Sequence, residues 1–170
     1  MRNTLFRRTQ ARGAITLVAA VAAALLLAEP AAAATWKGME PFVSKRADVE
    51  RQLGTPVSDR MSEAGTLQFK VTGGTVTVFF VTPKFIAAKR LSPELEGTVL
   101  QIVLQHERAT DTPESLNIVN NSDFERQAKG NTEVFTNAKE GLIYTFIESR
   151  LRTTRYFYSA QQFARIQRGR

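Results

Sequence analysis

One histidine and no cysteine limit the chemistry that this 170-residue sequence can do. His106 stands next to Glu107 and Arg108. A serine nucleophile would need this histidine as its base, together with an orienting carboxylate and an oxyanion hole. No serine stands in the glycine-flanked pattern of a nucleophile elbow. We therefore expect His106 to be an exposed residue at the end of a strand, without a catalytic role.

Two pairs of carboxylates recur in the same pattern, Asp48 with Glu50 and Asp123 with Glu125. Paired carboxylates can perform acid–base or glycosidase chemistry. Residues two apart on a helix point in different directions, which argues against a catalytic pair. Asp48 is better explained as a charge in the first turn that stabilises the positive end of a helix. The sequence also lacks the usual zinc ligands, a calcium loop and a phosphate-binding glycine loop. It therefore predicts no catalytic residues, no metal site and no cofactor.

Positive charge gathers at the C-terminal end of the chain. Positions 150–170 hold no acid and six arginines, namely Arg150, Arg152, Arg155, Arg165, Arg168 and Arg170. Such a basic end predicts contact with an anionic surface such as a membrane. The alternative is a solvated edge strand and tail, in which arginines add solubility. Aromatic residues stand among these arginines at 156–158, but alternate residues of a strand face opposite ways, and we expect no nucleic-acid partner.

The first 34 residues follow the three-part pattern of a secretory signal. Four arginines precede an apolar run at 14–28, and four alanines follow it at 31–34. The run is shorter than the about 20 residues that cross a bilayer as a helix. The pattern predicts a cleavable signal peptide over 1–34 and an exported protein, periplasmic or extracellular. The alternative is an uncleaved membrane anchor.

The remaining residues, 35–170, predict one domain that is stabilised by packing alone, because without cysteine it can form no disulfide. Ser44 suits the N-cap of a short helix over 45–53, which a glycine and then a proline bring to an end. Val49 and Leu53 are four residues apart and share one face of that helix. We expect this face to cover an apolar sheet, since so short a helix is unstable alone.

Strands follow this helix. Alternating apolar residues and Gly73-Gly74 predict a β-hairpin over 67–82, and a third strand spans 98–105. The second half of the chain predicts a helix over 123–129 closed by Gly130, strands over 142–148 and 151–158, and a last helix capped by Ser159.

The two halves share a short motif. Asp-Phe-Glu-Arg-Gln at 123–127 matches Asp-Val-Glu-Arg-Gln at 48–52 in four of five positions. This match predicts an internal repeat of 44–82 in 122–158, that is, two tandem helix–strand units. The expected fold is α+β, with one or two antiparallel sheets and short helices packed on one face.

The segment SKRADVERQLGTP at 44–56, preceded by Trp36-Lys37-Gly38 and Pro41, resembles a pattern found in a group of uncharacterised exported bacterial proteins. More distantly, its helix and following hairpin are similar to outer-membrane lipoproteins of the SmpA/OmlA type and to the β-lactamase-inhibitor-like fold. The resemblance implies a protein-binding scaffold without catalysis. The chain lacks the lipidated cysteine of those lipoproteins, so anchoring in their manner is not expected.

Together these features predict a non-enzymatic exported module that binds another exported protein or a cell-envelope component through an exposed sheet face. Two alternatives stay open. One is an exported enzyme that uses carboxylates and arginines on an anionic substrate. The other is electrostatic docking of the 150–170 end on an anionic membrane, as a peripheral contact that salt would weaken.

Overall fold

The structure, a computed structural model, describes residues 34–168. The predicted signal peptide therefore lies outside the described residues except for its last alanine, and Arg170 lies outside them too. The strands are β1 (Ser58–Arg60), β2 (Thr66–Val71), β3 (Gly74–Phe80), β4 (Val99–His106), β5 (Glu125–Lys129), β6 (Thr132–Asn137), β7 (Leu142–Ile147) and β8 (Arg150–Phe157). The helices are α2 (Arg46–Leu53), α3 (Met61–Ala64), α4 (Pro83–Lys89) and α5 (Ala160–Arg168), with a 3-10 turn, η1, at Pro93–Leu95.

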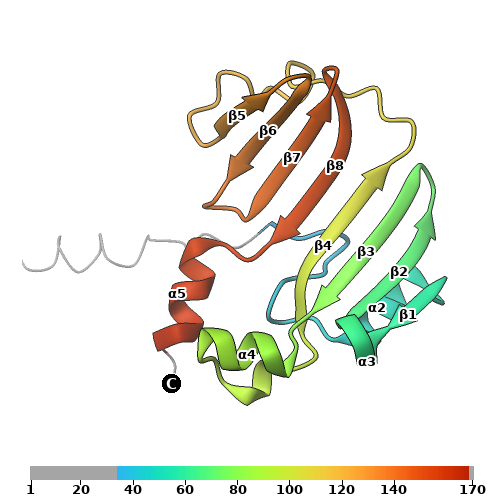
Figure 1. Cartoon of the computed structure of the whole chain (residues 1–170), viewed down its shortest axis with the longest axis vertical. Helices are drawn as coiled ribbons and strands as arrows, with labels where there is room; N and C mark the ends of the chain where they lie inside the picture. Colours follow the sequence, from blue (N-terminus) through green and yellow to red (C-terminus); the bar gives the residue numbers. More distant parts are fainter. Residues whose placement is uncertain (1–33, 169–170) are drawn as a thin grey trace, which may run out of the picture. The chain divides into compact units, whose positions relative to one another are not determined.

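The eight strands form one antiparallel sheet in the order β1-β2-β3-β4-β8-β7-β6-β5. Strands β1–β4 are one antiparallel meander and β5–β8 are a second, and the last strands of the two meanders pair with each other (Figure 1). The α+β class with an antiparallel sheet and short helices is therefore confirmed, with one sheet rather than two.

Helix α2 packs on the first meander as the apolar pattern predicts. Val49 is fully buried, and Leu53 packs against the same core cluster, in which Leu67 and Val78 come from the sheet. The predicted cap is wrong: the Ser44 hydroxyl accepts a hydrogen bond from the Glu40 backbone N–H and so closes the preceding turn. The helix start is stabilised instead by the Asp48 carboxylate, which accepts the Lys45 N–H at 2.9 Å.

The predicted strands of the first half are present with small shifts. The hairpin turn falls at Thr72-Gly73, one residue earlier than expected, because Gly74 already belongs to β3. Helix α4 lies between the hairpin and the third strand. It begins after Thr82, whose hydroxyl accepts the Phe85 N–H, and has proline in its first turn.

The predicted helix over 123–129 is wrong, because residues 125–129 form the exposed edge strand β5. Asn121 turns the chain just before it by accepting the Asp123 N–H on its side chain. Gly130 has a φ of 61° and forms a two-residue hairpin turn with Asn131, where the sequence reading took it for a helix end. The matching pentapeptides of the predicted repeat therefore differ: 48–52 lie in a helix, whereas 123–127 pass from a turn into strand β5.

An irregular segment covers the second meander where a helix was expected. Ile118 is buried against Phe135, Phe146 and Leu151, with Leu116 and other partly buried side chains around them. A third apolar cluster joins α4 and α5 at the end of the sheet where β8 finishes. The Ser159 hydroxyl caps α5 as predicted, because it accepts the Gln162 N–H at 3.0 Å.

Candidate functional site

One face of the sheet is covered and the other is open. The alternate residues that point toward α2 and the segment 107–124 supply the first two core clusters. The opposite set, which we call the open face, contains no buried residue. By register it consists of Ser58, Arg60, Thr66, Gln68, Lys70, Thr75, Thr77, Phe79, Gln101, Val103, Gln105, Arg150, Thr153, Arg155, Phe157, Ile143, Thr145, Ile147, Thr132, Val134, Thr136, Glu125, Gln127 and Lys129.

The open face is mostly uncharged and rich in threonine and branched apolar side chains, with one cation at its centre. Arg155 is exposed, and its register partners on the two sides are Val103 in β4 and Ile143 in β7. Among the side chains that the structure describes, no carboxylate lies at ion-pair distance from Arg155. Lys70, nearer one side of this face, is already paired with Glu107. The centre of the face therefore offers an uncompensated positive charge in an apolar and hydroxyl-bearing surround.

The structure does not bring the predicted arginines into one patch. Arg150 and Arg152 lie at the start of β8 and Arg155 lies within it, and all three are exposed. Arg165 and Arg168 are exposed on α5, beyond the other end of β8. At about 3.3 Å per residue, β8 is about 25 Å long. Arg150 at its start is therefore far from Arg165 and Arg168 beyond its end, and Arg155 lies between them along the chain. Of these five arginines, Arg155 lies near the centre of the open face, and Arg150, the register partner of Ile147, lies at its end.

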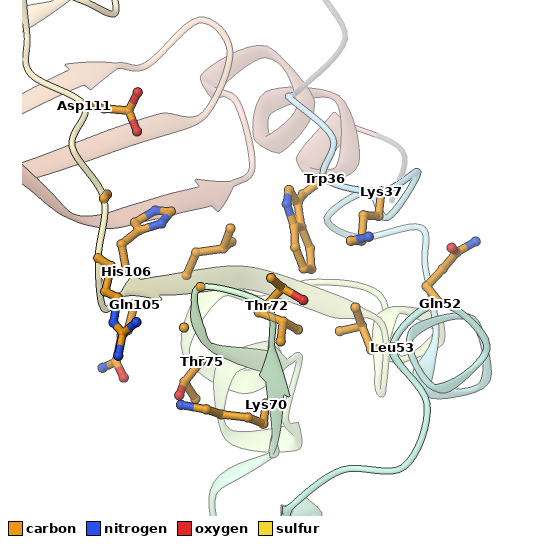
Figure 2. A pocket seen from close by; sticks show the side chains of 16 residues that line it. Trp36, Lys37, Gln52, Leu53, Lys70, Thr72, Thr75, Gln105, His106 and Asp111 are labelled. Carbon is orange, nitrogen blue, oxygen red and sulfur yellow. The ribbon is translucent and has the colours of Figure 1, made fainter.

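A cavity of about 690 Å³ lies at one end of the covered face, where the β2–β3 hairpin meets the N-terminal segment and the residues after β4. Its apolar lining includes Trp36, Leu53, Val71 and Leu104, and all four also pack against the first core cluster. Figure 2 shows Trp36 and His106 on the same side of the β4 ribbon, with Lys70 and Thr75 on the other side.

His106 forms one wall of this cavity, and its Nε2 lies 2.9 Å from the hydroxyl of the buried Thr154. Burial lowers the pKa of His106 because it disfavours the imidazolium, and the negative charge of Asp111 opposes this only in part. The histidine is therefore uncharged at neutral pH. The sequence reading placed His106 correctly at a strand end, but it is half-buried rather than exposed.

Cations outnumber acids around the cavity. Lys37 and Arg108 line it, and neither forms an ion pair with any carboxylate whose side chain the structure describes. The Lys37 ammonium lies 5.6 Å from the centroid of the Trp36 ring, close enough for a cation–π interaction. Lys70 also contributes to the lining but pairs with Glu107, and the acid in the lining is Asp111.

The carboxylate pairs found in the sequence have structural partners. Asp48 contacts Arg51, and Glu50 contacts Arg46 on the same helix. In the second half, Asp123 contacts Lys139. Each of these acids has an exposed or half-exposed side chain, and the two pairs lie on separate elements, α2 and the segment of β5.

Among the described residues, no group of three or more histidine, cysteine or acidic side chains could hold a metal ion. In the same range, no helix is both long and apolar enough to pass through a lipid bilayer. No protein-family model, curated protein or solved structure matches this chain. The resemblance that the 44–56 segment carries therefore stays a prediction.

Sequence reasoning named the arginines but missed the cavity and the special position of Arg155. Alternation over 151–158 was recognised, so the face of Arg155 could be assigned once its neighbours were known. The pairing of β4 with β8 joins segments about 50 residues apart, and no local pattern indicates it. Trp36, the chain's only tryptophan, was a signal in the sequence that could have pointed to the cavity.

Proposed function

We propose that this chain is an exported, non-enzymatic binding module whose open face docks a second exported or envelope protein that presents an acidic side chain. The observation that carries the proposal is Arg155, an exposed and unpaired cation between Val103 and Ile143 at the centre of an otherwise mostly neutral face. A buried charge at an interface needs a partner of opposite sign, so an acid on the docked protein would pair with Arg155.

The size of the open face supports a protein as the partner. Eight strands about 4.8 Å apart and about 20 Å long present on the order of 700 Å². A specific protein–protein interface of standard size buries about 800 Å² on each partner. Branched side chains and threonines lose little conformational freedom when they become buried, which favours such a contact.

The separation of the other arginines supports a protein over a membrane surface. A flat anionic bilayer attracts basic residues that can reach it together, at about 1 kcal/mol for each. Arg150 lies at one end of β8 and Arg165 and Arg168 lie beyond the other, so the predicted arginines do not gather in one basic patch.

Site-directed crosslinking tests the proposal, because the chain has no native cysteine. A single cysteine at Thr145, on the open face, carries a photoreactive group in the envelope of the producing cell. The matched control carries the same group at Gln161, an exposed position on α5. We expect a discrete adduct from Thr145→Cys alone. Adducts of equal yield from both positions would contradict a specific open face.

The charge test uses two exposed arginines as a pair. Arg155→Glu, introduced into the Thr145→Cys chain, should lower the adduct yield and weaken the affinity for the purified partner by about tenfold or more. Arg165→Glu changes the net charge equally but lies off the open face, and it should leave the affinity unchanged. An equal loss from both variants would indicate general electrostatic attraction instead.

Cleavage before Thr35, seen as the N-terminus of the processed protein, tests the export part of the proposal.

A further inference from the structure

The cavity at the covered end of the sheet differs from the open face in shape and chemistry. Its volume of about 690 Å³ falls within the range of about 300–1,000 Å³ typical of small-molecule sites. Its apolar part is built from Trp36, Leu53, Val71 and Leu104, which come from four separate segments of the chain. Lys70, Thr75 and Gln105, at one edge of the open face, also contribute to the lining.

The polar part of the cavity has an excess of positive charge. Lys37 stands on the turn next to Trp36, and Arg108 follows the end of β4, so the two cations in the lining come from different segments. Neither has an ion-pair partner within residues 34–168, whereas Lys70 is neutralised by Glu107. His106 adds a polar wall without a charge at neutral pH.

From this combination we infer that the cavity binds a small amphipathic carboxylate, with its apolar body on Trp36 and Leu104 and its anionic head between Lys37 and Arg108. Desolvating either cation without an anion costs free energy, so the charges select an acid over a neutral molecule of the same shape. Small hydrophilic anions bury none of the apolar lining, so we expect them to bind more weakly than an amphipathic carboxylate.

The chain carries its own reporter for this site. Trp36 is its single tryptophan, so both its fluorescence and its indole N–H resonance report on the cavity wall alone. Decanoate serves as the probe, and decan-1-ol is the uncharged control with the same alkyl chain. We expect decanoate to change the Trp36 emission and move the indole resonance in a saturable manner, with at least tenfold weaker binding of decan-1-ol.

Charge reversal locates the head group. Arg108→Glu and Lys37→Glu should each weaken decanoate binding about tenfold, whereas Lys84→Glu, on the exposed side of α4, should leave it unchanged. Three results would overturn the inference: no saturable change at Trp36, equal binding of decan-1-ol, or equal binding by wild type and both cavity variants. None of these depends on the open face, so failure here leaves the proposed docking surface untouched.

Discussion

Strands β1–β4 lie beneath helix α2, whereas strands β5–β8 lie beneath the irregular segment 107–124. Both meanders have four antiparallel strands, and both bury phenylalanines on the covered face. A sheet of this kind therefore needs an apolar cover on one face, but that cover need not be a helix. Val49 supplies it in the first half and Ile118 in the second.

The matching pentapeptides 48–52 and 123–127 adopt different structures because their surroundings differ. In 48–52, Val49 reaches the core, and Leu53 one turn later packs on the same cluster. In 123–127, the chain has just turned at Asn121, and it soon enters a Gly-Asn hairpin followed by the β-rich strand β6. The local preference of a pentapeptide for helix or strand is weak, so tertiary packing determines which of the two forms.

The largest expected effect comes from one glycine in each half: Gly74 is the first residue of β3, and Gly141 immediately precedes β7. A Cβ at Gly74 would lie 1.9 Å from the Gln105 carbonyl oxygen, and one at Gly141 would lie 2.1 Å from that of Phe157. Gly74→Ala and Gly141→Ala should each lower the free energy of unfolding by about 2–4 kcal/mol.

Chemical denaturation measures this change, with Gly73→Ala as the control, since nothing lies within 4 Å of a Cβ there. Gly73→Ala should lower the free energy of unfolding by only about 1 kcal/mol, because alanine is disfavoured at the positive φ of Gly73. If both halves fold as one unit, Gly74→Ala and Gly141→Ala shift a single transition. Two separate unfolding transitions would contradict this, because they would show that the two meanders unfold independently.

The next effect compares the two covers. Ile118→Ala should lower the free energy of unfolding by about 3 kcal/mol and Val49→Ala by about 2 kcal/mol, since both leave a cavity in a buried cluster. Urea unfolding followed by circular dichroism gives both values. A loss below about 1 kcal/mol for Ile118→Ala would mean that the irregular segment does not hold the second meander as α2 holds the first.

The smallest effect concerns the helix start. The Lys45 N–H, with help from Arg51, holds the pKa of Asp48 below its ordinary value of 3.8. A lowered carboxyl pKa adds stability that is fully present above the ordinary pKa and is lost as pH falls through the folded-state pKa. Stability measured between pH 6 and pH 2 should therefore fall less on acidification in Asp48→Asn than in the wild type.

At pH 6, Asp48→Asn should lower the free energy of unfolding by less than Ile118→Ala or Val49→Ala does. The counterpart Asp123→Asn removes only a surface contact with Lys139 and no helix cap, so it should change the free energy of unfolding less than Asp48→Asn. An equal effect from both would show that Asp48 acts as a surface charge and not as a cap.

Elements with an uninterrupted local pattern were predictable from the sequence. Helix α2 and strands β2, β3, β4, β7 and β8 each have an apolar period of their own, and their bounds agree within a few residues. Strand β5 was mistaken for a helix because Gly130 can end a helix or turn a hairpin, and only the strand after it decides. The cavity and the setting of Arg155 depend on contacts between distant segments, which no local pattern contains.

The central claim, that the sheet is covered on one face and open on the other, can be tested with two adjacent residues of β8. Thr153 belongs to the open face, whereas Thr154 is 4% exposed and lies against His106 on the covered face. Thiol labelling of the folded single-cysteine variants Thr153→Cys and Thr154→Cys compares them directly. We expect fast labelling at 153 and strong protection at 154. Equal labelling rates at the two positions would contradict the account.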